Sequence, residues 1–368
     1  MNLVIDARMI DHAGIGRYLR SLLIRLKNSP LNIQAIVSKS SVAKYPWLSQ
    51  FALIFCESPI YSLKEQLKIP LLIPKCALFW SPHYNVPLAP IRAKQRLVTI
   101  HDVYHLAFIS TLSPLQKAYA KIVIKRAVNQ ASSIITDSEF SKNEIVKYTG
   151  SCPHKIQVIH PAVDREQFKE QRETKLAEVQ KKYQLPEKYI LFVGSLKPHK
   201  NLIRLVDALE LILKLHSRDL HLVIVGKKEG LIHGVDLDRY LHQKSISKHV
   251  SCLGLVEDND LPSLYQQAAA LALPSLYEGF GLPALEAMSV GCPVVASNAA
   301  SLPEVCGNSA EYVNPLDVQD ICRGIVKLLY NDEYRKALVL QGKKRSQEFS
   351  WEKCTEEHLK AINLCIYK

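Results

Sequence analysis

The chain has 368 residues, of which 48% are hydrophobic and 22% are charged, and its formal net charge is +12 at pH 7. This composition excludes a disordered or fibrous protein, and the length exceeds the size at which one hydrophobic core keeps growing, so two domains are expected. The positive charge suits nucleic acid, anionic lipid headgroups or an acidic small substrate, and it does not choose among the three.

The first residues do not show the charged, apolar and small-residue succession of a signal peptide, because the apolar run from Asn2 ends at Asp6. The longest uncharged stretches are too short for a membrane-spanning helix. We therefore expect a cytoplasmic protein. Its nine cysteines are scattered and include no Cys-x-x-Cys pair, which predicts reduced thiols in the core rather than disulfides or a zinc site.

Short apolar runs alternate with longer helical patterns through the first half of the chain, as in parallel sheets with crossover helices. The predicted strands are Leu3 to Asp6, Ile33 to Val37, Ala77 to Trp80, Leu97 to Ile100, Ser133 to Thr136 and Ile156 to Ile159. The predicted helices are Gly16 to Lys27, Pro114 to Gln130 and Glu139 to Tyr148.

The charged, strand-poor run from Asp164 to Glu187 predicts a domain boundary, after which the same alternation begins again. The strands predicted there are Tyr189 to Val193, Leu220 to Val225, Val250 to Leu253, Ala270 to Leu273 and Pro293 to Ala296, and the helices are Leu202 to Leu215, Leu261 to Gln267 and Pro283 to Ser289. The tail after Pro315 is helical. The predicted domains are residues 1–175 and 176–347, followed by a C-terminal helix in 348–368.

Ligands of open parallel sheets bind beyond the carboxyl ends of the strands, and two candidate sites of the first half follow predicted strands. Gly14 and Gly16 could present helix N-terminal amides to a phosphate, although the third glycine of a dinucleotide fingerprint is missing and a structural turn explains them equally well. His101, with Asp102 beside it, could stabilise or shuttle charge; a hydrogen-bonded histidine at a strand end is the alternative.

In the second half, the strand ending at Val193 is followed by Gly194 and Ser195, and Lys200 comes just before a helix. An amide, a hydroxyl and an ammonium group could then meet one anion. As the alternative, Lys197 and Lys200 are solvated loop charges.

The most specific pattern is Glu278-Gly-Phe-Gly-Leu-Pro-Ala-Leu-Glu286, which lies between two apolar strands. Glu278 stands in the loop, and Glu286 lies about two helical turns into the following helix. The amides at the helix start suit a diphosphate, whereas the two carboxylates suit sugar hydroxyls. The pattern therefore indicates a ligand that has both groups.

This Glu-x7-Glu pattern, with the following Gly291-Cys-Pro-Val-Val295 and Pro303-Glu304, resembles the retaining GT-B glycosyltransferases of family 4. The resemblance extends over nearly the whole chain in the family's order: Gly14 and Gly16, His101-Asp102, Gly194 to Asn201, Gly254-Leu-Val256, Glu278 to Glu286 and Ser350-Trp351. It implies an α/β fold of two Rossmann-like parallel-sheet domains facing a central cleft. The first would bind the acceptor and the second the nucleotide sugar, and the C-terminal helix would cross back to the first domain.

The resemblance also implies roles for single residues. Gly14, Gly16, Gly194, Ser195, Lys200, Val256, Glu278, Phe280, Gly281, Leu282 and Glu286 would bind the donor, and His101, Glu278 and Lys200 would be catalytic. Within this set, Ser195 and Lys200 would neutralise the diphosphate, Val256 would hold the base, Glu278 would contact the sugar and Glu286 the ribose. Some members carry Arg where this chain has Ser195, so Lys200 would bear more of the charge.

The family chemistry retains the anomeric configuration, and we expect same-face attack without a cofactor or an essential metal ion. The sequences Asp236-Leu-Asp238 and Asp258-Asn-Asp260 look like metal-binding Asp-x-Asp pairs, but both stand at helix starts. They are better explained as N-terminal helix caps.

The expected partners are a nucleotide-diphosphate sugar and a saccharide or lipid-linked acceptor. Ile5-Asp-Ala-Arg8 with Gly14 to Tyr18 resembles bacterial mannosyltransferases of surface polysaccharide synthesis, which makes GDP-mannose the first choice of donor and a UDP-hexose the second. Lys117, Lys121 and Lys125 recur every four residues and predict a basic helix face, either solvated or resting on anionic lipid at the cytoplasmic membrane.

Three other functions are alternatives to glycosyl transfer. A nucleic-acid binder would explain the charge, but the sequence shows no zinc finger, basic heptad or aromatic RNA-binding motif, so no nucleic-acid partner is expected. A non-catalytic nucleotide-binding subunit and a nucleotide-sugar epimerase of similar architecture stay open.

Overall fold

The computed structural model describes residues 2–216, 219–227 and 235–367, which form two compact units. The first unit ends at Pro161 and resumes at Ser350, and the second is Ala162–Phe349. The predicted range 1–175 differs from this division, because residues after 161 pack on the second unit. There Phe168 is buried, its ring lies 6.2 Å from that of Tyr265, and its carbonyl accepts a hydrogen bond of 2.9 Å from Ser289 Oγ.

The sheet of the first unit has seven parallel strands in the order β3-β2-β1-β4-β5-β6-β7. Their bounds are β1 Asn2–Asp6, β2 Asn32–Val37, β3 Ala52–Phe55, β4 Cys76–Ser81, β5 Ala93–Thr99, β6 Ser133–Thr136 and β7 Ile156–Val158. All six predicted strands are present. The sequence missed β3, an edge strand without a buried residue and hence without a strong apolar pattern.

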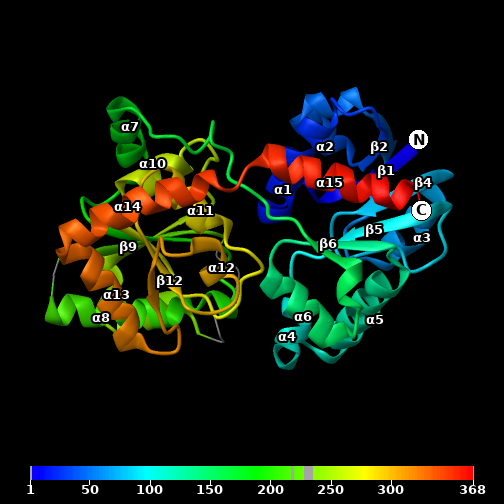
Figure 1. Cartoon of the computed structure of the whole chain (residues 1–368). Helices are drawn as coiled ribbons and strands as arrows, with labels where there is room; N and C mark the ends of the chain where they lie inside the picture. Colours follow the sequence, from blue (N-terminus) through cyan, green and yellow to red (C-terminus); the bar gives the residue numbers. More distant parts are fainter. Residues whose placement is uncertain (1, 217–218, 228–234, 368) are drawn as a thin grey trace. The chain divides into compact units, whose positions relative to one another are not determined.

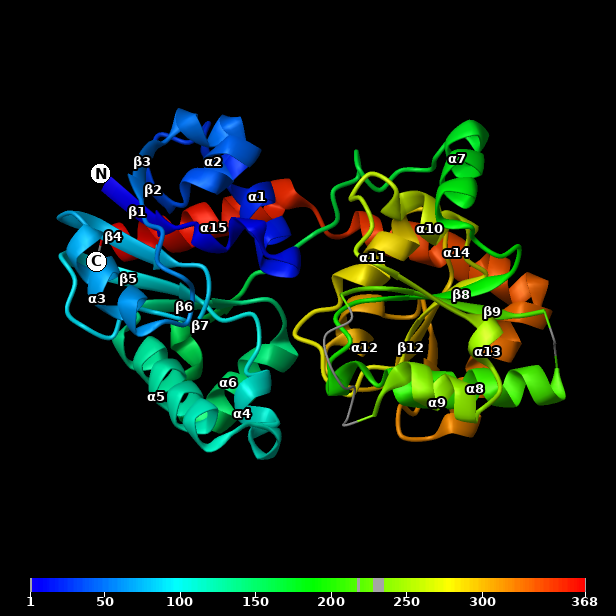
Figure 2. The ribbon, with the colours of Figure 1, turned by 180° about the vertical axis from the view of Figure 1, so that it is seen from behind.

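Helices cover both faces of this sheet (Figures 1 and 2). On one face lie α1 (Ala13–Leu26) and α15 (Trp351–Ile366), which contact each other, and α15 also contacts β4 and β5. On the other face lie α3 (Leu63–Leu72), α5 (Pro114–Gln130) and α6 (Glu139–Thr149), whose apolar sides pack on strand residues such as Phe79 and Val98. Two short helices complete the unit, α2 (Lys39–Lys44) and α4 (Tyr104–Ala107).

The sheet of the second unit has six parallel strands in the order β10-β9-β8-β11-β12-β13. Their bounds are β8 Tyr189–Val193, β9 His221–Val225, β10 Val250–Gly254, β11 Ala270–Leu273, β12 Val294–Ser297 and β13 Glu311–Val313. The five predicted strands are present, and the three-residue β13 was missed. The central strands are continuous apolar runs because helices cover both faces.

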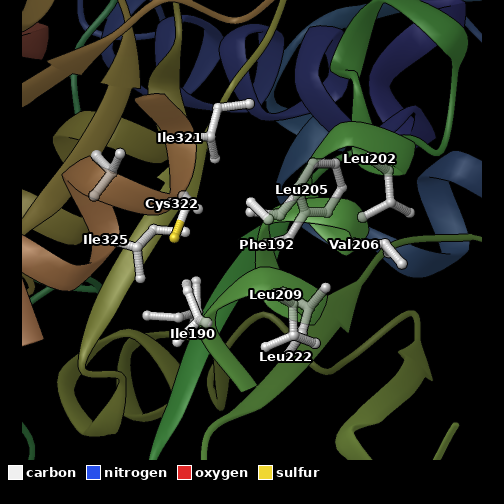
Figure 3. Close-up of a cluster of buried hydrophobic side chains, with 14 of the residues drawn as sticks. Ile190, Phe192, Leu202, Leu205, Val206, Leu209, Leu222, Ile321, Cys322 and Ile325 are labelled. Atoms are coloured by element: carbon white, nitrogen blue, oxygen red, sulfur yellow. The ribbon is translucent and has the colours of Figure 1, made fainter. Parts of the chain in front are cut away.

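One hydrophobic cluster of the second unit lies beneath α8 (Leu202–Leu215) and α13 (Val318–Tyr330), where Leu205 and Leu209 pack with Ile190 and Phe192 of β8 (Figure 3). The other helices of the second unit are α7 Glu173–Tyr183, α9 Leu237–Gln243, α10 Leu261–Gln267, α11 Leu282–Ser289, α12 Leu302–Cys306 and α14 Asp332–Gln347.

Short 3-10 helices occur in both units. They are η1 Arg8–Asp11, η2 Pro46–Gln50, η3 Ile109–Thr111 and η4 Pro153–Lys155 in the first unit, and η5 Pro198–Lys200 and η6 Ser247–His249 in the second.

The two Asp-x-Asp sequences differ in their roles. Asp236 caps α9 as predicted, since its side chain accepts the N–H of Arg239 at 3.1 Å. Asp260 stands at the N-cap position of α10 but binds elsewhere, with its carboxylate 2.9 Å from Lys175 Nζ and 2.7 Å from Lys182 Nζ. It therefore anchors α7 to α10, and the prediction of a helix cap is wrong for this residue.

The described residues bear on three further sequence expectations. Among them, no three His, Cys, Asp or Glu side chains gather where they could hold a metal ion, and no helix is long and apolar enough to cross a membrane. All nine cysteines are free; seven are buried as predicted, whereas Cys152 and Cys252 are exposed.

Candidate active site

Both sheets have a switch point, where the strand order reverses direction: between β1 and β4 in the first unit and between β8 and β11 in the second. Open parallel sheets bind ligands outside the carboxyl ends of the strands at such a point. Gly194 and Ser195 follow β8, and Ser275 and Glu278 follow β11. The loops that carry Gly194 and Glu278 therefore both leave strands that flank the switch point of their own sheet.

Lys200 and Glu278 form an ion pair at this point. Lys200 Nζ lies 2.6 Å from Glu278 Oε2, and Ser275 Oγ donates to Oε1 of the same carboxylate at 2.8 Å. The two charged side chains are only 18% and 9% exposed. A carboxylate offers about four lone-pair positions, so Glu278 keeps about two for further hydroxyl donors.

Asn201 positions the loop that carries Lys200. Its backbone is left-handed, with φ 61°, at the N-cap position of α8, and its side chain is buried. Its Nδ2 donates to the carbonyls of Pro274 at 2.9 Å and Pro315 at 2.6 Å, which tie η5 to the ends of β11 and β13. No role was predicted for Asn201; the tolerance of asparagine for this conformation is the signal that could have indicated one.

The start of α11 is shaped around Gly281. This residue has φ 106°, and a Cβ there would lie 2.7 Å from Leu302 Cδ2, so glycine is required. Ser301 Oγ donates to the carbonyls of Glu278 at 2.9 Å and Phe280 at 2.8 Å, which fixes the preceding loop. The N-cap residue Gly281 has no side chain that could cap α11, Pro283 has no N–H, and the Ala284 N–H donates to the Gly281 carbonyl at 3.0 Å. The amide of Leu282 is therefore the group of this first turn that can meet an anion at the positive end of the helix.

The remaining predicted residues of the second unit lie in α11 and in the loop after β10. Glu286 is buried in α11 and accepts a hydrogen bond of 2.8 Å from Tyr265 OH. Val256 is half-buried in the loop after β10. Gly226, which was not predicted, comes directly after β9. It packs so closely against the neighbouring loop that a Cβ there would lie 1.9 Å from the carbonyl oxygen of Gly194. Its place directly after a predicted strand is the signal that was overlooked.

In the first unit, His101 follows β5 and is paired with Asp137, which follows β6. His101 Nδ1 lies 2.7 Å from Asp137 Oδ2, and Nε2 lies 3.2 Å from the carbonyl oxygen of Pro82. Burial lowers the pKa of His101, but the carboxylate of Asp137, with smaller contributions from Asp102 and the Pro82 carbonyl, outweighs burial, so the net pKa is raised. Because both ring nitrogens face acceptors, the imidazolium form fits this site. Asp102 accepts the N–H of Tyr104 at 2.9 Å, which fits the interpretation that it only orients its own loop, whereas the pairing of His101 with Asp137 was not predicted.

The two glycines after β1 lie inside the first turn of α1. A Cβ at Gly16 would lie 2.3 Å from the carbonyl oxygen of Ile10, and the Gly16 N–H already donates to the backbone carbonyl of His12 at 2.9 Å. This contact supports the structural explanation of Gly16. Gly14 has open space around it, and no side chain of the described residues caps α1. The structure groups these glycines with His101 in one unit and the remaining predicted site residues in the other.

Two Rossmann-like parallel sheets of matching strand order give the chain the GT-B fold of glycosyltransferases. The structure is similar to sucrose-phosphate synthase from Thermosynechococcus elongatus, with a TM-score of 0.78 and 19% identity over 99% of this chain and 98% of that chain. At this identity the likeness concerns the fold.

Sequence relatives give the family. Residues 14–167 match the model "Glycosyltransferase Family 4", and residues 175–345 match "Glycosyl transferases group 1". O-antigen chain mannosyltransferase B of Escherichia coli is 32% identical over 78% of this chain and 74% of that protein. O-antigen chain mannosyltransferase RfbU of Salmonella typhimurium is 30% identical over 70% of this chain and 66% of that protein. The chain belongs to glycosyltransferase family 4, and the predictions of family, fold class and enzyme class are confirmed.

Proposed function

We propose that this glycosyltransferase moves mannose from GDP-mannose, with retention of configuration, to a saccharide or lipid-linked saccharide in cell-surface polysaccharide synthesis. The observation that supports it most is the Lys200–Glu278 pair at the switch point, in a chain related to an O-antigen mannosyltransferase. A UDP-hexose donor and a non-catalytic nucleotide-binding role are the alternatives that the experiment below separates.

In this proposal the second unit binds the donor. Lys200, Ser195 and the amides of Phe280, Gly281 and Leu282 neutralise the diphosphate and stabilise it as it departs, so preorganised positive charge takes the place of a metal ion. Glu278 accepts hydrogen bonds from the hydroxyls of the transferred sugar with its remaining lone pairs. Glu286 accepts from the ribose, and the backbone at Val256 holds the base.

The first unit supplies His101 beside the transferred sugar. As an imidazolium held by Asp137, it adds positive charge where the departing phosphate develops negative charge. The acceptor hydroxyl attacks on the face from which the diphosphate leaves. The bond from the acceptor oxygen to the anomeric carbon forms, the bond from that carbon to the phosphate oxygen breaks, and the phosphate takes the hydroxyl proton.

The donor assignment is tested by thermal unfolding of the whole chain with GDP, UDP, ADP and dTDP in EDTA. A ligand at 100 times its Kd adds about 2.7 kcal/mol to stability. We expect GDP to raise the Tm most and radiolabelled mannose to pass from GDP-mannose to a lipid-linked saccharide extract. Protection by UDP alone would favour the UDP-hexose alternative, and binding without transfer would favour the non-catalytic one.

We also propose that the first unit rests on anionic membrane from the cytoplasmic side. In α5, Lys121 and Lys125 are exposed next to Ile122, which is 60% exposed. In α3, the exposed leucines Leu63, Leu67 and Leu71 follow one another at helical spacing, with lysines between them. Exposed apolar side chains beside lysines suit the interface of an anionic bilayer.

Vesicle sedimentation tests this membrane contact. The chain should sediment with vesicles that contain phosphatidylglycerol and stay in the supernatant with pure phosphatidylcholine. The double variant Lys121→Glu, Lys125→Glu and the variant Leu67→Glu should each reduce sedimentation, whereas Lys336→Glu, in α14 of the second unit, should not. Equal sedimentation of all variants would contradict the proposal.

A further inference from the structure

Two buried side chains of the first unit link the C-terminal helix to His101. They are Tyr18 of α1 and His358 of α15, which are separated by 340 positions in the chain and are 2% and 0% exposed. Helix α15 lies beside α1 and contacts β4 and β5 (Figures 1 and 2). The chemistry above uses neither residue, although a phenol and an imidazole are costly to bury unless they are hydrogen-bonded.

Tyr18 and His358 share a hydrogen bond whose direction follows from the surroundings of His358. Its Nδ1 lies 2.7 Å from the carbonyl oxygen of Cys354, so this nitrogen carries a proton. Burial lowers the pKa of His358 to about 4, with a smaller contribution from the charge of His101, so the ring is neutral and Nε2 is an acceptor. The hydroxyl of Tyr18, 2.5 Å from Nε2, is therefore the donor, and it is fixed to the C-terminal helix.

The ring of Tyr18 in turn packs against the ring of His101. The two centroids lie 4.8 Å apart, and the ring planes are nearly perpendicular, at 87°. Edge-to-face pairs of this kind are favourable and depend on orientation. The nitrogen atoms of His101 are bound to Asp137 and to the carbonyl oxygen of Pro82, which leaves the ring able to tilt about the line through both nitrogens. Contact with the Tyr18 ring restricts this tilt.

Two tryptophans pack around the Tyr18–His358 pair. The ring of Trp351, the first residue of α15, lies 6.2 Å from that of Tyr18, and the ring of Trp80 lies 5.6 Å from that of His358. Trp80 is itself fixed, since its Nε1 donates to Thr99 Oγ1 at 3.0 Å. Both tryptophans are at most 2% exposed. Close-packed interiors transmit a displacement to their neighbours, so a shift of His358 reaches Tyr18.

We infer that Tyr18 and His358 are positioning residues for His101, with His358 fixing the hydroxyl of Tyr18 and the Tyr18 ring fixing the imidazole of His101. The inference rests on the catalytic role proposed above for His101, and it adds two residues that are too deeply buried to touch the substrate. The C-terminal helix then takes part in the reaction by orienting a catalytic group, besides packing on the first sheet.

Steady-state kinetics of the whole chain, with GDP-mannose and the lipid-linked saccharide extract, test the inference. His358→Leu removes the acceptor of the Tyr18 hydroxyl and should lower kcat by about 10- to 100-fold, the range for a slightly misplaced catalytic group. The KM for GDP-mannose and the Kd for GDP should not change, because the proposed donor groups lie in the second unit. His358→Gln, whose amide oxygen can take the place of Nε2, should recover most of kcat.

A double-mutant cycle shows whether the two residues act through one hydrogen bond. Tyr18→Phe removes the hydroxyl, keeps the ring and should also lower kcat. Combined with His358→Leu, it should lower kcat no further than His358→Leu alone, whereas independent effects would multiply. Tyr18→Phe changes few atoms, so it carries the test if His358→Leu does not fold.

NMR of the histidine ring protons provides a readout that does not depend on activity. The signals of His101, assigned by their loss in His101→Gln, should shift in His358→Leu and Tyr18→Phe. Thr355→Val is the matched control, because it removes a buried hydrogen bond of 2.7 Å in the same helix, from Thr355 Oγ1 to the Trp351 carbonyl. It should keep the wild-type kcat and the His101 signals.

Two results would overturn the inference: unchanged His101 signals in both His358→Leu and Tyr18→Phe, or an equal loss of kcat in Thr355→Val and His358→Leu. Failure of the proposed function is a separate result. It would appear as a wild type that transfers no mannose from GDP-mannose, and the His101 signals would then decide the positioning by themselves.

Discussion

Lys200 Nζ lies 2.6 Å from Glu278 Oε2, although 78 positions separate the two residues in the chain. The pair closes at the switch point between β8 and β11 and is largely shielded from water. A free lysine in a donor site would be mobile and hydrated, whereas this one is held in place by a carboxylate. A diphosphate would compete with Glu278 for the ammonium group of Lys200. The Glu278 carboxylate could then accept hydrogen bonds from the sugar hydroxyls.

Lys200→Met should therefore abolish most of the protection by the nucleotide. Loss of one charge-assisted hydrogen bond costs about 1.5–3 kcal/mol, which corresponds to roughly 10- to 150-fold weaker binding. Isothermal titration with GDP measures the change. Lys197→Met, in the same loop but exposed, is the control and should bind GDP like the wild type. If both variants lose affinity equally, the charge of the loop matters and the Lys200 position does not.

Asn201→Asp should destabilise the second unit. The substitution replaces the Nδ2 that holds the carbonyls of Pro274 and Pro315 with an acceptor oxygen, and it buries a charge against two carbonyls. Leaving two buried groups unsatisfied costs about 1–3 kcal/mol for each group. Urea unfolding monitored by circular dichroism should show a lower midpoint. Asn32→Asp, an exposed asparagine of the first unit, should leave the midpoint unchanged.

His101 should titrate above its ordinary pKa. Burial alone lowers the pKa, so removal of the Asp137 charge in Asp137→Asn should bring the pKa below 6.5. NMR of the histidine ring protons measures both values. In the wild type the stabilisation from this pair is complete below pH 6.5 and is lost as the pH rises through the raised pKa. Asp102→Asn should move the pKa less, because Asp102 contributes less to the shift. Equal shifts in both variants would contradict the assigned pairing.

The sequence predicted the sheets well because their central strands are buried on both faces and form continuous apolar runs. It missed β3 and β13, an edge strand and a strand of three residues, since short or exposed strands bury too little apolar surface to produce a pattern. It also missed α7, because the charged composition of residues 164–187 resembles a linker. The helix forms there because Lys175 and Lys182 find a buried carboxylate, Asp260, that lies far along the chain.

The candidate site was predictable to the extent that it follows strand ends. The positions of Lys200 and Glu278 came from the pattern, but their contact depends on strand order, which periodicity does not encode. Asp137 was missed for the same reason: it follows its own strand, and only the adjacency of β5 and β6 brings it to His101. Asn201 and Gly226 serve backbone geometry, which a single sequence indicates weakly.

His358 should make the first unit less stable at acidic pH, whereas the His101–Asp137 pair loses its stabilising effect as the pH rises. It is fully buried in α15, where its Nδ1 donates to the carbonyl of Cys354 at 2.7 Å and its Nε2 accepts from Tyr18 OH at 2.5 Å. Burial lowers the pKa of His358 to about 4 from an ordinary 6.5. Between pH 6.5 and 4 this histidine is therefore protonated in the unfolded chain but neutral in the folded unit. The stability present above pH 6.5 is lost as the pH falls towards 4.

The loss amounts to about 3 kcal/mol over that interval, at 1.36 kcal/mol for each unit of pKa difference. The free energy of unfolding in urea at pH 7.5 and pH 5 should therefore differ less for His358→Gln than for the wild type. His154→Gln replaces an exposed histidine of the same unit and should keep the wild-type difference. If His358→Gln keeps it as well, another group is responsible for the acid sensitivity. A smaller difference in His358→Gln alone would show that a neutral imidazole between α1 and α15 helps hold the C-terminal helix on the first unit.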